Sequence, residues 1–149
     1  MAIYLSNATR GSGLDFAALE ATTDALLAAL GEAGSSVSLS FVRDPAIRSL
    51  NRAHRGKDAP TDVLSFPLVE DGDTYAGAER LLGDIVISID TARRQAADYD
   101  APLGREIERL LIHGLLHLLG HDHMEPGERA AMEAEERRLA DAIGMPWPY

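Results

Sequence analysis

Two kinds of hydrophobic periodicity alternate along this chain. Between residues 14 and 30 the apolar side chains recur every three or four positions, which predicts an amphipathic helix. Between residues 37 and 41 they alternate with serines, which predicts a half-buried strand. Applied to the whole chain, the two patterns predict the order βαβαββααα. The strands are expected at residues 2–5, 37–41, 63–66 and 83–89, and the helices at 14–30, from Pro45 onward, at 91–99, 102–119 and 125–143. Asp44 is expected to cap the helix that Pro45 begins.

This order predicts an α+β fold. The chain has 149 residues, enough for one domain with its own core, so we expect a single domain over residues 1–149. Its centre should be a small mixed four-stranded sheet covered by helices. Segment 102–119 carries leucine and isoleucine on nearly every side, so it is expected to be the central, buried helix.

Four of the five histidines lie in one short segment of that helix and the turn after it, which reads HGLLHLLGHDH from His113 to His123. His113 and His117 are four residues apart, so on a helix they share one face. Gly120 tolerates the left-handed turn that ends helices, after which His123 can return to the same ion. Three imidazoles with an open fourth position are the pattern of a catalytic zinc site, and the helix is therefore expected to bear a metal.

Two observations bear on this metal site. His121 is the competing third ligand, because it would stack one turn beyond His117 if the helix continued past Gly120. We favour His123, since the frame His-x3-His-x2-Gly-x2-His matches that of the metzincin zinc proteins. The position after the first histidine is Gly114, where zinc peptidases of the H-E-x-x-H type carry a glutamate base. This absence weighs against a peptidase.

Composition narrows the class of protein. The net charge of −10 alone argues against nucleic-acid binding, but residues 43–57 hold five basic residues against one acidic residue. They form either a basic patch on an acidic body or a solvated helix face. The absence of cysteine excludes Cys-ligated zinc and fits a cytoplasmic protein. No apolar run approaches the ~20 residues that a membrane helix needs, and no secretory signal is visible.

Two further motifs accompany the histidines: LNRAHRGKDAPTDVLSFP from Leu50 and GDIVIS from Gly83. In this order the three motifs resemble the YbeY family of bacterial endoribonucleases and rRNA maturation factors, and the resemblance covers essentially the whole chain. It implies one zinc ion per chain on His113, His117 and His123. It also implies an arginine important for activity at the position of Arg55. The preceding residue is often aromatic in the family and is His54 here, which makes His54 a candidate for an extra contact.

The resemblance implies an activity and partners as well. The activity is single-strand-directed RNA cleavage in rRNA maturation, notably at the small-subunit 3′ end, and in ribosome quality control. The partners are ribosomal RNA and the ribosome or its assembly factors. We expect a cytoplasmic location and no membrane association, while the oligomeric state is open. Two other functions stay in view: a metallohydrolase of another class, such as a peptidase, and a non-catalytic assembly factor with a structural zinc.

Residue chemistry agrees with a hydrolase. A three-histidine zinc lowers the pKa of its water to about 7, so hydroxide could attack the phosphodiester; alternatively the ribose 2′-hydroxyl attacks a polarised phosphate. The expected catalytic residues are His117 and Arg55. The Arg55 guanidinium suits bidentate phosphate binding, and Lys57 and Arg52 could extend that contact.

Some of these side chains have alternative roles. Arg55 could instead pair with Asp58 or Asp62. Glu106 shares the face of the two helical histidines and could orient them, or it could simply favour the helix N-terminus. Asp122 could orient a ligand imidazole or cap the next helix.

Overall fold

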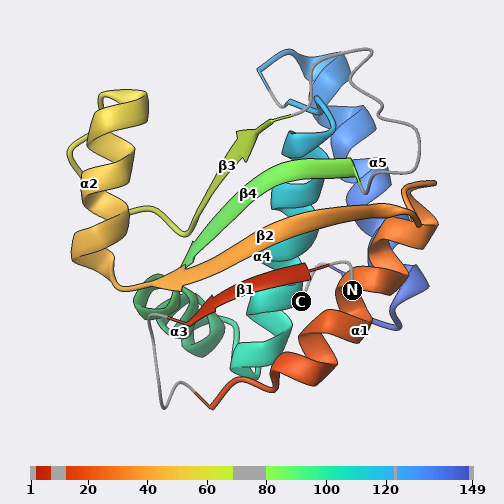
Figure 1. Ribbon diagram of the computed structural model, residues 1–149, viewed down its shortest axis with the longest axis horizontal. Coiled ribbons are helices and arrows are strands. Elements are labelled where there is room, and N and C mark those ends of the chain that lie inside the picture. Colours follow the sequence, from red (N-terminus) through yellow and green to blue (C-terminus); the bar gives the residue numbers. More distant parts are fainter. Residues whose placement is uncertain (1–2, 8–12, 69–79, 123, 148–149) are drawn as a thin grey trace.

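Four strands form one sheet in the order β1-β2-β4-β3 (Figure 1). The first three strands in that order run parallel, and β3 pairs antiparallel with β4 at the edge. The computed structural model describes residues 3–7, 13–68, 80–122 and 124–147. The strands are β1 (Ile3–Asn7), β2 (Ser35–Val42), β3 (Val63–Pro67) and β4 (Arg80–Ser88), and the helices are α1 (Phe16–Ala29), α2 (Asp44–Arg55), α3 (Ile89–Asp98), α4 (Leu103–Leu118) and α5 (Pro126–Ala142). The predicted α+β class and the order of the elements are confirmed.

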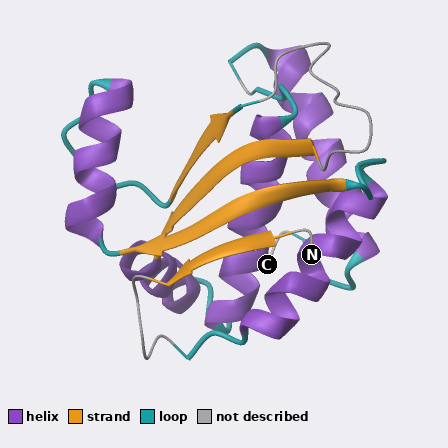
Figure 2. Ribbon diagram, viewed as in Figure 1, coloured by secondary structure: helices purple, strands orange, loops and turns teal. Residues whose placement is uncertain are grey.

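The main core lies between one face of the sheet and α4, which α1, α3 and α5 surround (Figure 2). Phe41 of β2 and Ile85 of β4 point into it and are fully buried. From α4, Ile107, Leu111 and Leu115 meet them with no exposed surface, and most of the helix is buried around its circumference. The prediction of a central, buried helix is therefore confirmed; that it bears a metal stays a prediction.

Helix α2 covers the opposite face at one end of the sheet (Figure 1). Its buried Ile47 packs on Leu64 of β3 and Val86 of β4. The strongly one-sided pattern of this helix leaves Arg48 and Arg52 on the outer side, where they meet solvent. This placement carries the C-terminal turn of α2 to the free edge of β3.

The role predicted for Asp44 as the cap of α2 is wrong. Arg43 holds the capping position without a side-chain cap of its own, and the Asp44 N–H donates to the Asp90 carboxylate at 2.9 Å. The Asp44 carboxylate instead accepts hydrogen bonds from Ser88 (2.6 Å), Thr91 (2.8 Å) and Arg94 (2.8 Å). Burial alone would raise the pKa of Asp44, but these hydrogen bonds hold that pKa below its ordinary value. Asp44 thus fastens α2 to the start of α3.

Candidate functional site

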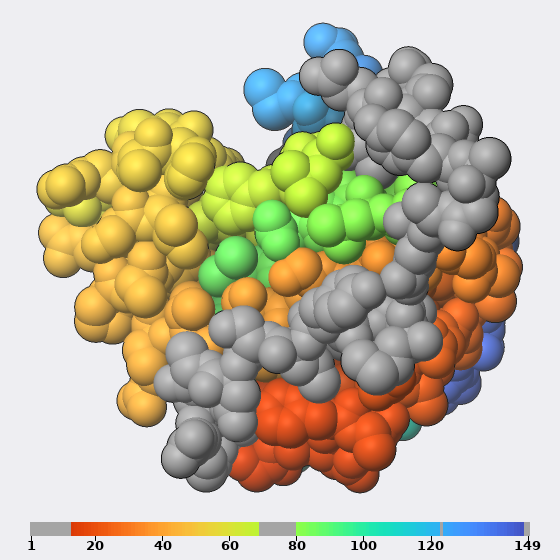
Figure 3. All heavy atoms as spheres, viewed as in Figure 1, coloured from red at the N-terminus to blue at the C-terminus, as the bar shows by residue number. Residues whose placement is uncertain are grey.

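A cavity of about 850 Å³ borders the free edge of β3. Its walls come from the last turn of α2, from β3 with the residues just before it, from the C-terminal half of α4 and from the turn after α4. In Figure 3 the surface is hollowed between the yellow atoms of α2 and the light-blue atoms that follow α4. The lining residues are His54, Arg55, Thr61, Asp62, Val63, Leu64, Ser65, Phe66, Pro67, His113, His117, Gly120, His121, Asp122 and Met124.

The two helical histidines face each other inside this cavity. The Nε2 atoms of His113 and His117 are 3.0 Å apart, and the ring planes are inclined by 74°. Two nitrogens that share one tetrahedral zinc ion, each at ~2.0–2.1 Å, lie about 3.3 Å apart. The pair therefore fits a shared ion, as the spacing of four residues predicts.

Helix α4 ends where Gly120 was expected to end it. The Gly120 backbone has a φ of 92°, and its N–H donates to the His117 carbonyl at 3.1 Å. The His121 N–H donates to the Leu116 carbonyl at 3.0 Å, which completes the glycine-ended motif that closes many helices. His121 therefore does not continue the row of His113 and His117.

The third ligand stays a prediction, because His123 lies outside the described residues. Within the described ranges, no group of three His, Asp or Glu side chains stands ready to hold an ion. His121 does line the cavity, and it lies near Glu135 of α5. Hydrogen bonds from Arg138 hold the pKa of Glu135 below its ordinary value, and His121 adds a smaller effect in the same direction.

A carboxylate that sequence analysis missed lies behind the histidine pair. Glu136 of α5 is 9% exposed, and its Oε2 is 3.8 Å from Nδ1 of His113, the ring nitrogen that faces away from His117. Glu136 shares the buried face of α5 with Met132 and Leu139. A carboxylate on the apolar face of an amphipathic helix was the signal that could have revealed it.

Glu106, considered above as a residue that could orient the two helical histidines, is bound by Arg109. It is fully buried and accepts a hydrogen bond from Arg109 Nε at 2.9 Å. Arg109 also approaches Asp62, whose carboxylate accepts from the Val63 N–H at 2.8 Å and from Gln95. This network supports the segment that leads into β3.

Asp122, by contrast, lines the cavity itself. It does not cap the next helix, because α5 begins with Glu125 in that position.

Arg55 also lines the cavity, and within the described chain it makes no hydrogen bond or ion pair. The two carboxylates considered as its partners are occupied. Arg48 binds both oxygens of Asp58, at 2.9 and 3.1 Å, and holds the pKa of Asp58 below its ordinary value. Asp62 belongs to the network around Arg109. The Arg55 guanidinium is thus available to an anion in the cavity.

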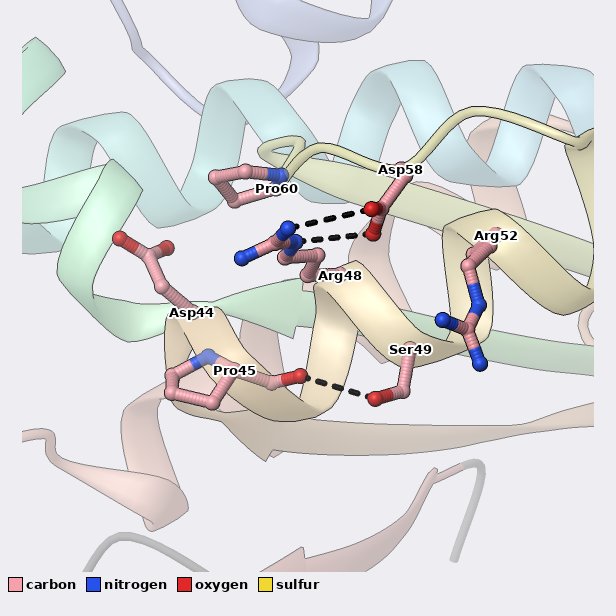
Figure 4. Close-up of a pocket in the computed structure, with 7 residues that line it drawn as sticks. All are labelled: Asp44, Pro45, Arg48, Ser49, Arg52, Asp58 and Pro60. Carbon is pink, nitrogen blue, oxygen red and sulfur yellow. Dashed lines mark hydrogen bonds and ion pairs between the residues drawn. The ribbon is translucent and has the colours of Figure 1, made fainter.

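The other two basic residues expected to bind substrate lie elsewhere. Arg52 lines a second hollow of about 450 Å³ on the outer side of α2, beside the Arg48–Asp58 pair (Figure 4). Lys57 is exposed in the loop after α2 and lines neither of these two hollows. Of the three predicted contacts, Arg55 alone shares the cavity with the histidines.

Comparison with known proteins shows the family of this chain. A sequence profile described as Endoribonuclease YbeY matches residues 7–144. The chain belongs to the YbeY family. Among curated members, it is 49% identical over 133 residues to "Endoribonuclease YbeY" of Moorella thermoacetica, with 85% of each chain covered. It is 52% identical over 121 residues to that of Anaeromyxobacter sp., where the match spans 81% of this chain and 61% of the relative's length.

A solved structure supports the fold of this YbeY-family chain. The solution structure of TM1509 from Thermotoga maritima superposes with a TM-score of 0.63 at 28% sequence identity. The match covers 95% of this chain and 89% of TM1509.

The fold explains why Gly114 replaces the glutamate of zinc peptidases in this family member. A Cβ at Gly114 would lie 3.0 Å from Ile85 Cγ2 and 3.3 Å from Ser65 Oγ. The Ser65 hydroxyl also donates to the Gly114 carbonyl at 3.1 Å. Helix α4 therefore approaches β3 and β4 so closely that a side chain here would push Ile85 aside, and a glutamate at this position would be directed at the sheet.

We expect Gly114→Ala to lower the free energy of unfolding by about 1 kcal/mol. Crowding the fully buried Ile85 costs ~1–3 kcal/mol, which outweighs the ~1 kcal/mol that alanine gains over glycine in a helix. Urea unfolding followed by circular dichroism measures the change. Gly104, in the first turn of the same helix, has open space around an added Cβ, so Gly104→Ala should stabilise the protein. Equal stabilisation by both variants would contradict the close approach at Gly114.

Proposed function

We propose that this chain is a zinc-dependent endoribonuclease that cuts single-stranded RNA during ribosomal RNA maturation and ribosome quality control in the cytoplasm, with the ribosome or its assembly factors as partners. The relatives that carry the name Endoribonuclease YbeY support RNA cleavage. One observation carries the proposal for this chain: the facing Nε2 atoms of His113 and His117 share a cavity with the Arg55 guanidinium, which makes no hydrogen bond or ion pair within the described residues. None of the described helices has the length and apolarity to cross a membrane.

The chemistry of the donors supports zinc. Neutral imidazole nitrogens are common zinc ligands, and we assign the ion to His113, His117 and His123. The pair is open to a wide cavity, as a catalytic rather than a structural ion requires. When bound, zinc supplies a Lewis acid for the negative charge that develops on the phosphate.

The chain's own residues then have separate tasks. Arg55 binds the non-bridging oxygens of the phosphodiester through a planar, permanently charged fork. It sits at the end of α2, where Gly56 turns the chain away with a φ of 70°. Glu136, 3.8 Å from Nδ1 of His113, is placed to favour the imidazole proton on that nitrogen, which leaves the Nε2 lone pair for the ion.

The test joins metal analysis to cleavage. Purified protein is assayed for bound zinc and then offered a single-stranded RNA, a duplex of the same sequence and an unfolded protein. We expect cleavage of the single strand alone, lost on chelation and restored by zinc. Proteolysis would instead support a peptidase, and stoichiometric zinc without RNA cleavage would support a non-catalytic assembly factor.

Glu136→Gln is expected to weaken zinc binding about 10- to 100-fold, the usual effect of losing a carboxylate behind a metal-binding histidine. The glutamine amide can donate to Nδ1, which moves the imidazole proton to Nε2, where it blocks the ion. Competition with a chelator measures the affinity. Glu133→Gln removes an exposed carboxylate of the same helix and should bind zinc like the wild type. If the two variants bind zinc equally well, Glu136 does not position His113.

A further inference from the structure

We propose that His54 and Phe66 form a stacking site for one unpaired nucleobase of the RNA strand. The inference rests on the proposed function and adds a reason for its strand selectivity. Both side chains line the cavity that contains His113 and His117. Their ring centroids are 4.9 Å apart, with the planes inclined by 66°. Two aromatic rings from separate elements therefore meet in the wall of the candidate active site.

The two rings differ in how firmly they are held. Phe66, on β3, is half-buried and packs against the cluster of Ile47, Leu64 and Val86. His54 is exposed on the last turn of α2 and leans against Phe66. The packed phenyl ring fixes the position of the pair, and the exposed imidazole is open to a ligand.

The neighbourhood of the rings fits a nucleotide. Arg55 follows His54 directly, lines the same cavity and makes no hydrogen bond or ion pair within the described residues. An exposed aromatic ring beside a guanidinium matches a base joined to its phosphate. Met124, which is 77% exposed, adds a further apolar side chain to the cavity.

This chemistry selects single strands. In a duplex each base face is covered by its neighbours in the stack, whereas an unpaired base can turn a face to the protein. Stacking of one base on an aromatic side chain changes affinity by about five- to 150-fold. The competing explanation is that the two rings only join α2 to β3, and the experiment separates the two.

The experiment measures the affinity of the full-length protein for a fluorescent single-stranded RNA by anisotropy. The bases of the RNA are removed one at a time, leaving the sugar and phosphate. In the wild type, one abasic position should weaken binding about fivefold or more. His54→Ala and Phe66→Leu should each weaken binding of the intact RNA by a similar factor and lose the response at that position. His54→Phe keeps a flat ring and should keep the response.

Leu50→Ala is the matched control. Leu50 packs against the same cluster from α2 but does not line the cavity, so this variant loosens the packing and should keep the abasic response. A response that persists in both His54→Ala and Phe66→Leu, or that Leu50→Ala also removes, overturns the stacking site. So does a wild type that binds and cleaves RNA without any sensitive position, and this result leaves the proposed function intact. A wild type that neither binds nor cleaves RNA overturns both.

Discussion

His117→Ala is expected to abolish stoichiometric zinc binding and to lower kcat/KM for single-stranded RNA at least about 100-fold. Its Nε2 lies 3.0 Å from that of His113, so alanine removes half of the described donor pair. A catalytic metal contributes several kcal/mol to the stabilisation of charge in the transition state, and ~2.7 kcal/mol already corresponds to a factor of about 100. Elemental analysis of the purified variant and initial cleavage rates measure the two effects.

Two companion variants decide the third ligand. His123→Ala should lose zinc as His117→Ala does. His121→Ala should retain it, because α4 ends at Gly120 and His121 leaves the row of the helical histidines. Loss of zinc in His121→Ala alone would transfer the third position to His121. If His117→Ala cleaves RNA as fast as the wild type, the activity comes from a contaminating nuclease.

Arg55→Ala is expected to lower kcat/KM about 10- to 150-fold while zinc binding stays unchanged. A hydrogen bond to a charged group contributes ~1.5–3 kcal/mol, and no described residue occupies the Arg55 guanidinium that would make such bonds to a phosphate. Steady-state cleavage of single-stranded RNA, together with zinc analysis, measures both quantities. The unchanged metal content separates this effect from that of His117→Ala.

Two controls accompany Arg55→Ala. Arg137→Ala removes one positive charge from an exposed position of α5 that does not line the cavity, and it should cleave RNA normally. Arg55→Lys keeps the charge but not the planar fork, so it should recover only part of the activity. Full activity in Arg55→Ala would show that the phosphate is bound elsewhere.

The helices and strands could be predicted where the local pattern of apolar and polar residues determines them. The periodicity over residues 14–30 and the alternation over residues 37–41 correspond to α1 and β2, with ends displaced by a few residues. Asp44 shows where prediction from local sequence fails. As an acidic residue before Pro45 it has the composition of a cap, yet its carboxylate is taken by Ser88 and Thr91, which come more than 40 residues later in the chain.

In the candidate site, too, some features follow from local sequence and others depend on tertiary packing. The facing of His113 and His117 follows from their spacing on a helix, and the end of α4 follows from Gly120. Glu136 behind His113 does not follow, because the contact depends on how α5 packs on α4. The availability of Arg55 is also a tertiary result, since it depends on the other partners that Asp58 and Asp62 find.

By itself, the sequence determined the order of the elements, the histidine pair, the glycine that ends their helix and the family motifs. These features depend on residues a few positions apart, and the geometry of a helix or strand relates such residues directly. Only the tertiary structure decided that Arg55, Phe66 and the histidines share one cavity, and that a side chain at Gly114 would crowd Ile85. Those contacts join different helices and strands, and their distances depend on how the helices pack on the sheet.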